Sequence, residues 1–499
     1  MFSHHYFMFP FRFDFIKEAF TDRHSYYKKY DFDQRVRIDD FLKKALEKDG
    51  WEYQRFQIKD ALDYNELVYF YDFVKDALFN TQDFDKNATS YYFEKKDARD
   101  KSFCINILDG KTYDLKIDSI TLRLFDTGVG ILAFELENEK YSDIEDILLI
   151  NEFGRRIYPQ FLDLKNGVER TKEAFLADSI EVCGIKESFD YKEIEKIRLA
   201  SYIEKILGEI FSIDSCKSEK YFIQPLLDDR MFVISWYGND EVSNKIKQDY
   251  IESELWYKYV FVDGKNLTVQ DIDMQKSLIK NSTYSRWKNY GTLYGITRYS
   301  FVVLTDTSDF SKNVILNHVK TMYFQMITLL LANRASILRF SDEITAISDI
   351  EPSNKGLSEK ISSLYKNYLR YKNKLYFKEI TSQEQGIELY DKAREIMRVD
   401  SDIRDLSEEI GSLNSYAYLL DEKDEKEQMN KLTKLGTIFL PGTFIAGIFG
   451  MNVFPEHFID NLGGWIISFG GMIALTWWLS YIHDINIKEF FIKKDKKDE

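Results

Sequence analysis

Two long apolar segments near the C-terminal end dominate the hydrophobic pattern of the chain. Residues 435–454 and 462–482 contain no charged side chain. About 20 apolar residues span the hydrocarbon core of a bilayer as a helix, and buried helices of soluble proteins rarely run this long without a charge. The pattern therefore predicts two transmembrane helices, with a buried helical hairpin as the alternative.

The lysines around these segments predict their orientation. Lys431 and Lys434 precede the first segment, and the connecting loop carries Glu456 and Asp460 but no lysine or arginine. Five more lysines follow the second segment: Lys488, Lys493, Lys494, Lys496 and Lys497. Because basic residues stay on the cytoplasmic side, we expect an integral protein of the plasma (inner) membrane with both termini in the cytoplasm.

The earlier part of the chain has the pattern of a mixed α/β (α+β) domain. Apolar runs at 119–125 and 130–136 flank Asp126-Thr127-Gly128, which predicts a β-hairpin. Residues 231–237 and 299–305 are further predicted strands, and 191–210 has a helical pattern. The first hundred residues, including the aromatic stretch 7–15, give no division into elements.

Helical spacing prevails from residue 313 onward. Residues 314–340 are predicted to be a packed core helix, because their most apolar part is too short to span a bilayer. Residues 355–378 form a second predicted helix. A third helical pattern starts near residue 382 and contains no proline before Pro441. If it continues to Gly447, it is about 100 Å long and predicts a stalk.

Together these patterns predict seven consecutive parts. They are a cytosolic mixed α/β domain (1–308), the helical part of that domain (309–380), a stalk helix (381–434), transmembrane helix 1 (435–454), an extracytoplasmic loop (455–461), transmembrane helix 2 (462–482) and a basic cytosolic tail (483–499).

Two spans cannot enclose a water-filled path, so several copies of the chain must assemble and each must contribute one helix to a shared pore. At about 100° per residue, one narrow stripe of the first span combines small, hydroxyl and apolar side chains. Such residues can line or gate a pore. The predicted pore-lining residues are Met429, Leu432, Gly436, Leu440, Thr443 and Gly447.

Extended toward the cytoplasm, the same stripe reaches Glu422 and Glu425. Rings of glutamate there would concentrate cations at a vestibule. Lys423 and Lys426 interrupt this acidic run, which favours the alternative of a solvated charged surface.

Composition excludes several classes of function. A formal net charge of −15 argues against nucleic acid as a partner, because such proteins present a basic face. No P-loop, metal-hydrolase spacing or nucleophile elbow occurs, so we expect neither an enzyme nor a bound cofactor.

The sequence of residues 437–452, TIFLPGTFIAGIFGMN, resembles the signature of the CorA family of divalent metal ion (magnesium) transporters. The family's Gly-Met-Asn motif corresponds to Gly450, Met451 and Asn452, at the outer end of the first span. The resemblance covers residues 431–499, and the rest of the chain is similar to the family in layout and order only.

The resemblance implies a homopentamer with a funnel-shaped cytosolic part. It also implies that Asn452 rings the outer mouth and binds a hydrated Mg²⁺, an ion that gives up its waters reluctantly. On a continuous helix Asn452 would lie off the pore stripe, so we expect the helix to turn near Gly450. Glu456 and Asp460 are candidate loop residues.

Regulatory Mg²⁺ between subunits is a further implication, but no acidic residue of this chain could be matched to it. The cargo stays open among Mg²⁺, Co²⁺, Ni²⁺ and Zn²⁺. The alternatives are a Zn²⁺ transporter of the related ZntB type and a non-conducting membrane-anchored signalling or scaffold protein.

Overall fold

The structure is a computed structural model. It describes residues 1–17, 38–80, 84, 88–107, 109–157, 177–189, 199–214, 216–228, 230–264, 267–348, 350, 356–450 and 462–482. Two compact units make up the chain. The first unit is Met1–Glu351 with Lys360–Ser412, and the second unit is Pro352–Glu359 with Leu413–Glu499.

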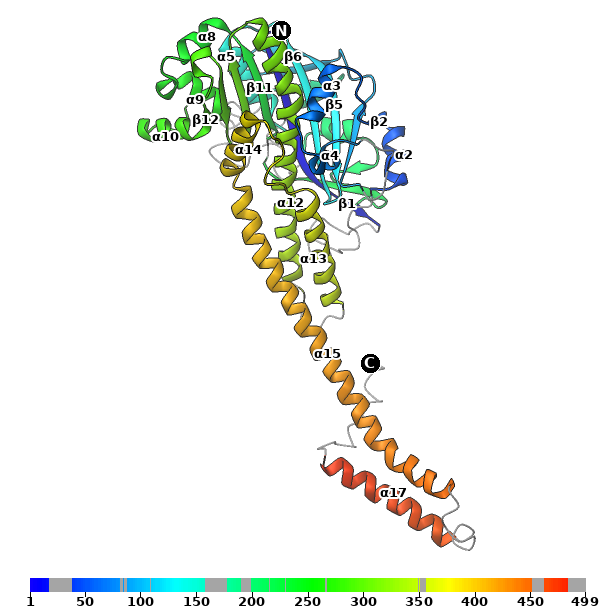
Figure 1. Ribbon diagram of the computed structural model, residues 1–499. Coiled ribbons are helices and arrows are strands. Elements are labelled where there is room, and N and C mark those ends of the chain that lie inside the picture. The colour runs from blue at the N-terminus through cyan, green and yellow to red at the C-terminus, as the bar shows by residue number, and fades with distance from the viewer. Residues whose placement is uncertain are drawn as a thin grey trace, which may run out of the picture. The chain divides into compact units, whose positions relative to one another are not determined.

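Strand β1 (Ser3–Ile16) lies at the centre of the first unit (Figure 1). One edge of β1 pairs antiparallel with β6 (Val129–Asn138) from Ser3 to Arg12. The other edge pairs with β11 (Phe232–Gly238) and then with β10 (Lys220–Pro225). The aromatic stretch 7–15 is thus a central strand with neighbours on both sides, which is a position that strongly β-forming residues favour.

Pro10 lies within this central strand, although proline cannot donate a ladder hydrogen bond. The pairing of β1 with β11 ends at Met8, and the pairing with β10 begins at Phe11. Pro10 therefore lies where one partner strand gives way to the next, and its position there explains how a central strand tolerates a proline.

The sheet has 14 strands in the described part of the chain. Its main path is β12-β13-β14-β11-β1-β6-β5-β4-β7-β8, with β10, β9, β3 and β2 off this path. The other bounds are β2 (Trp51–Tyr53), β3 (Ser90–Lys95), β4 (Ser102–Asn106), β5 (Thr112–Phe125), β7 (Ser179–Val182), β8 (Ile185–Ser188), β9 (Phe211–Ser212), β12 (Thr283–Tyr284), β13 (Leu293–Ile296) and β14 (Ser300–Thr305).

The two faces of β1 belong to different layers. Phe7, Phe9, Phe11 and Phe13 alternate onto one face and join the main hydrophobic core, where α5 (Ile144–Gly154) contacts the strand. The opposite face meets α12 (Phe324–Ser348), which runs beside β1 in Figure 1. The sheet is thus covered on both faces, which is why β1 is buried along almost its whole length.

Buried ions join the second face of β1 to α12. Arg339 Nη2 lies 2.5 Å from Asp14 Oδ1, and Arg339 Nε lies 3.1 Å from Glu343 Oε1. The guanidinium also donates to the carbonyl of Gly128 at 2.7 Å. All three charged side chains have no exposed surface, so each depends on these partners.

Shorter helices complete the first unit. They are α2 (Asp40–Lys48), α3 (Ala61–Val68), α4 (Asp72–Leu78), α7 (Ser201–Leu207), α8 (Asp240–Ile246), α9 (Glu254–Phe261), α10 (Ile272–Ser282) and α11 (Leu316–His318). Three-residue 3-10 turns occur at Tyr250–Glu252 and Lys288–Tyr290, and π turns at Ser311–Ile315 and Val319–Tyr323.

The mixed α/β prediction for this part is confirmed. The predicted hairpin is β5 and β6, joined by the turn at residues 126–128, and the two further strands are β11 and β14. The helix predicted at 191–210 is wrong in extent. Its described part, α7, begins at Ser201 and ends before Gly208, whose φ of 112° suits glycine, while residues 190–198 lie outside the described chain.

Five long helices follow the sheet in the described part of the chain. The predicted core helix is α12 with the helical turns before it, and α13 (Leu357–Lys374) corresponds to the second prediction. The pattern starting near residue 382 is not one helix. It is α14 (Glu384–Ile396), a break at Met397 and Arg398, and α15 (Val399–Gly450). The last described helix is α17 (Leu462–Ile482).

Candidate functional site

The C-terminal half of α15 carries the predicted pore-lining stripe. The helix is continuous over 52 residues and passes through Pro441, whose missing N–H removes one backbone hydrogen bond without ending the helix. All six predicted residues lie on this one element, so the geometry that places them on a common face is the regular rotation of an α-helix.

Apolar side chains of the stripe contact little else in the single chain. Met429 is 66% exposed, Leu432 69% and Leu440 64%. A Cβ added to Gly436 or Gly447 would meet no atom within 4 Å. Large apolar side chains this exposed mark a surface that lipid or another protein covers.

Thr443 is the hydroxyl residue of the stripe. Its Oγ1 lies 2.9 Å from the carbonyl oxygen of Leu440 and donates to it within the same helix. Because the proton points back to the backbone, the lone pairs of Oγ1 are left to accept from outside the helix. A hydrated cation, whose waters present hydrogens outward, is a suitable donor for such an oxygen.

The predicted vestibule residues lie further toward the start of α15. Lys426 Nζ lies 2.6 Å from Glu422 Oε1, one helical turn away. The hydrogen bond and charge of Lys426 lower the pKa of Glu422. Glu422 is thus ionised but neutralised within its own chain, and Glu425 has no described ion pair. This pairing favours a solvated charged surface over a strongly attractive ring at Glu422.

The outer end of the predicted pathway is described only in part. Gly450 is the last residue of α15. Met451, Asn452, Glu456 and Asp460 lie outside the described residues. The expected turn near Gly450 that would aim Asn452 at the axis therefore stays a prediction.

Helix α17 has the bounds of the second predicted span. Its described apolar side chains are largely exposed, including Ile467 at 66% and Trp477 at 69%. Within the described chain, one helical segment, Ser311–Ser348, is long and apolar enough by length and composition to cross a membrane. Of its most apolar stretch 72% is buried, and it packs in the first unit as the core helix that the sequence predicts.

Comparison with known proteins finds a family likeness in the C-terminal part of the chain. The sequence profile described as CorA-like Mg²⁺ transporter protein matches residues 313–482. This part of the chain is thus CorA-like. The match begins just before α12 and ends at the last residue of α17, so it includes both predicted spans and the pore stripe.

One solved structure that matches is "The complete structure of CorA magnesium transporter from Methanocaldococcus jannaschii". The match covers 52% of this chain and 94% of that chain, at 15% sequence identity and a TM-score of 0.22. No curated protein matches the chain.

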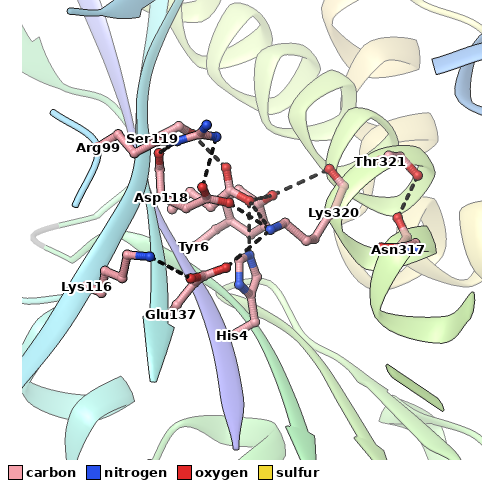
Figure 2. A network of polar contacts seen from close by, with 11 residues as sticks. His4, Tyr6, Arg99, Lys116, Asp118, Ser119, Glu137, Asn317, Lys320 and Thr321 are labelled. Carbon is pink, nitrogen blue, oxygen red and sulfur yellow. Dashed lines mark hydrogen bonds and ion pairs between the residues drawn. The ribbon is translucent and has the colours of Figure 1, made fainter. Parts of the chain in front are cut away.

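The first unit also has a polar network that the sequence did not predict. Figure 2 shows Lys320, from the turn before α12, pointing toward acidic side chains of the sheet. Its Nζ lies 2.7 Å from Asp118, 3.3 Å from Glu135 and 3.7 Å from Glu137. The lysine ammonium thus lies among three carboxylates of the sheet.

Electrostatics in this network favour its charged state. Burial raises the pKa of Glu135, but the imidazole of His4 and the ammonium of Lys320 outweigh burial and hold this pKa well below its usual range. Tyr6 and Ser119 also donate to the Glu135 carboxylate, at 2.8 Å and 2.6 Å. The Glu135 carboxylate thus has cationic and hydroxyl partners on several sides.

Regulatory metal binding, implied by the family resemblance, finds no site within one copy of the described chain. No three histidine, cysteine, aspartate or glutamate side chains converge there as metal ligands. The carboxylates around Lys320 come from β5 and β6 and are already neutralised by its charge, so they do not fit a divalent cation.

Proposed function

We propose that the chain is the subunit of an oligomeric membrane channel that carries divalent cations, with Mg²⁺ as its principal cargo. The stripe on α15 lines the pore, and Asn452 forms its outer ring. The observation that carries the proposal is the exposure of Met429, Leu432 and Leu440 on a helix inside the CorA-like region. Such a helix needs both lipid and other copies of itself to cover it.

The physical case for a hydrated cargo comes from the side chains of the stripe. They include the lone pairs of Thr443 and no acidic ligand above Glu425. Neutral oxygens suit an ion that keeps its water shell, because direct coordination by carboxylates would require dehydration. A negative cytoplasm favours entry by about 2.3 kcal/mol per elementary charge per 100 mV. No nucleotide and no catalytic residue is required.

Ion flux into liposomes containing the purified full-length protein tests this proposal. An interior-negative potential is imposed, and uptake of Mg²⁺ and Zn²⁺ is followed with internal indicators. We expect potential-driven Mg²⁺ uptake that Asn452→Ala reduces at least tenfold. Faster Zn²⁺ than Mg²⁺ uptake would favour the zinc transporter. Absence of flux for both ions would favour the non-conducting scaffold and contradict the proposal.

The pore-lining face is tested by cysteine accessibility. In a background with Cys104, Cys183 and Cys216 replaced by serine, Thr443→Cys and the adjacent Phe444→Cys form a matched pair. Successive residues differ by about 100° around a helix, so a water-soluble cationic thiol reagent should block flux through Thr443→Cys only. Equal block of both variants, or of neither, would contradict the assigned face.

A further inference from the structure

A cavity of about 520 Å³ opens in the first unit beside the ionic cluster of Lys320. Its walls come from α3 and the segment before it, from strands β1, β3, β5 and β6, and from α12 with its preceding turn. The volume falls in the range of small-molecule sites, roughly 300–1,000 Å³. Both charged and aromatic side chains line it, and the charges differ in how fully they are paired.

Arg123, on β5, is the buried cation of this cavity. Its side chain is 4% exposed, and it donates from Nη1 to Gln325 Oε1 at 2.8 Å. The guanidinium carbon lies 5.1 Å from the ring centre of Tyr92. Among the described acids none forms an ion pair with Arg123, and burial lowers its pKa. Most N–H groups of the Arg123 guanidinium are therefore available to a ligand.

Two other cations of the cavity wall are already paired. Arg99 donates to Asp118 at 3.1 Å, and Lys320 lies among Asp118, Glu135 and Glu137. Arg55 and Lys59 also line the cavity, but both are exposed. Arg123 is thus a buried cation of the described wall that, unlike Arg99 and Lys320, has no carboxylate in contact.

Glu66, on α3, is an acid linked to Arg123 through one shared glutamine, Gln325. It accepts from Gln325 Nε2 at 2.9 Å, and that same glutamine accepts from Arg123. Burial raises the pKa of Glu66 to about 7. Glu66 is therefore about half protonated near neutral pH, and in its neutral form it repels no anion and can donate a hydrogen bond.

Tyr92, on β3, adds a second donor to the wall. No hydrogen bond of its hydroxyl occurs within the described chain, and its ring stacks under Arg123. Burial raises the pKa of Tyr92, so the hydroxyl keeps its proton. Tyr6 and Phe324 stack at 4.5 Å on another part of the wall and give it an apolar surface.

We propose that this cavity binds a small organic oxyanion, a carboxylate or a phosphate ester with an aromatic group, through the Arg123 guanidinium and the Tyr92 hydroxyl. A buried guanidinium pairs with such groups through two parallel hydrogen bonds, and this geometry suits planar oxyanions. The aromatic surface beside it accepts the rest of the ligand.

Protonation of Glu66 should accompany binding. The charged groups that face it are Asp63 on the same helix, Arg123 on β5, and, around the same cavity, Arg55, Lys59, Asp60, Arg99, Asp118, Glu135 and Lys320. An arriving anion adds negative charge beside Glu66 and favours its neutral form. Affinity should therefore rise as pH falls from 8 to 6, and Glu66→Gln should remove this dependence.

Direct calorimetric titration of the full-length protein in detergent tests the proposal. The probes are sodium benzoate, adenosine 5′-monophosphate and inorganic phosphate, with adenosine as the uncharged control. We expect benzoate or the monophosphate to bind more tightly than phosphate, and adenosine at least tenfold more weakly than its monophosphate. A preference between benzoate and the monophosphate identifies the oxyanion as carboxylate or phosphate.

Variants locate the binding. Arg123→Gln should weaken affinity for the better probe at least tenfold, and Tyr92→Phe, which loses no internal hydrogen bond, should weaken it several-fold. Arg99→Gln, a matched change at an arginine already paired with Asp118, should alter affinity less than twofold. If Arg123→Gln does not fold, Arg123→Lys replaces it, since it keeps the charge without the fork.

Two results would overturn the proposal. One is the absence of binding by every oxyanion probe to the wild-type protein. The other is unchanged affinity in both Tyr92→Phe and the folded Arg123 variant. The inference does not rest on ion transport, because binding is measured without flux.

Discussion

At the scale of single residues, β1 carries a buried histidine whose titration affects stability. His5 Nδ1 lies 2.8 Å from Asn151 Oδ1, and its Nε2 lies 2.7 Å from Ser3 Oγ. Burial, reinforced by the neighbouring His4 and opposed by the hydrogen bond to Asn151, lowers the pKa of His5 to about 3. Between about pH 6.5 and 3 the folded protein thus keeps His5 neutral, whereas the unfolded chain protonates it.

The free energy of unfolding should fall as pH decreases from about 6.5 toward 3. In that interval the unfolded state binds a proton that the folded state excludes, at about 1.4 kcal/mol per pH unit. Urea unfolding of the wild type and of His5→Gln between pH 7 and 5 measures the effect. The variant should lose this slope, and parallel pH curves for the two proteins would show that His5 contributes none of it.

Individual residues also show where sequence reasoning succeeded and where it stopped. The alternation of Phe7, Phe9, Phe11 and Phe13 has the period of a strand, but Pro10 interrupts the pattern, and β1 was not predicted. Pro10 is tolerated because it lies between two partner strands, whose residues are more than 200 positions away. Large sequence separation also hid the cluster of Lys320 with Asp118 and Glu135.

At the scale of elements, the break between α14 and α15 differs most from expectation. The sequence from 382 to 440 contains no proline and keeps a helical pattern, so it predicted one helix. The break is produced by a single left-handed residue, Arg398, with φ of 58°. Its N–H donates to the carbonyl of Glu395 at 3.0 Å and closes the end of α14. Arginine gives no local signal for this conformation.

Glycine should suit position 398 better than arginine. A non-glycine residue in the left-handed region costs about 1–2 kcal/mol, partly offset by the greater flexibility of unfolded glycine. We expect Arg398→Gly to raise the free energy of unfolding by about 0.5–1 kcal/mol in thermal or urea unfolding. Arg398→Ala keeps the strain and loses the contact with Asp402, so it should not stabilise. Stabilisation by alanine equal to that by glycine would contradict the explanation.

The predicted elements near the membrane agree with the sequence because their signal is local. Length and absence of charge define α17 with no reference to the rest of the chain. The extent of α7 could not be predicted from the local sequence. Its beginning at Ser201 depends on Glu187, whose carboxylate accepts hydrogen bonds from the backbone N–H and the hydroxyl of Ser201.

At the scale of the whole molecule, α15 belongs to both units without an intervening loop. Its residues up to Ser412 are part of the first unit, and those from Leu413 onward are part of the second unit. Along a regular helix each residue is rotated by about 100° from the one before it, so the stripe keeps a regular angular spacing from earlier residues of α15.

The effect of an insertion into α15 on ion flux should therefore depend on how far it rotates the stripe, and not on the number of residues inserted. One alanine added after Asp424 turns the stripe by about 100°, whereas seven alanines turn it by about two full turns less 20°. In the liposome assay we expect the single insertion to reduce Mg²⁺ flux far more than the longer one. Equal flux through both, at equal protein content, would contradict transmission of rotation along α15.

The central place of β1 in the sheet has a consequence for biogenesis. This strand is synthesised before its partners. Its edges are paired only when β6 and β11 exist, the latter ending at Gly238, and one face is covered only when α12, which ends at Ser348, is present. Until then an alternating row of phenylalanines has no native neighbours, and such segments bind chaperones or self-associate. Translation of more than two hundred residues must precede its burial, so the nascent chain depends on protection at the ribosome.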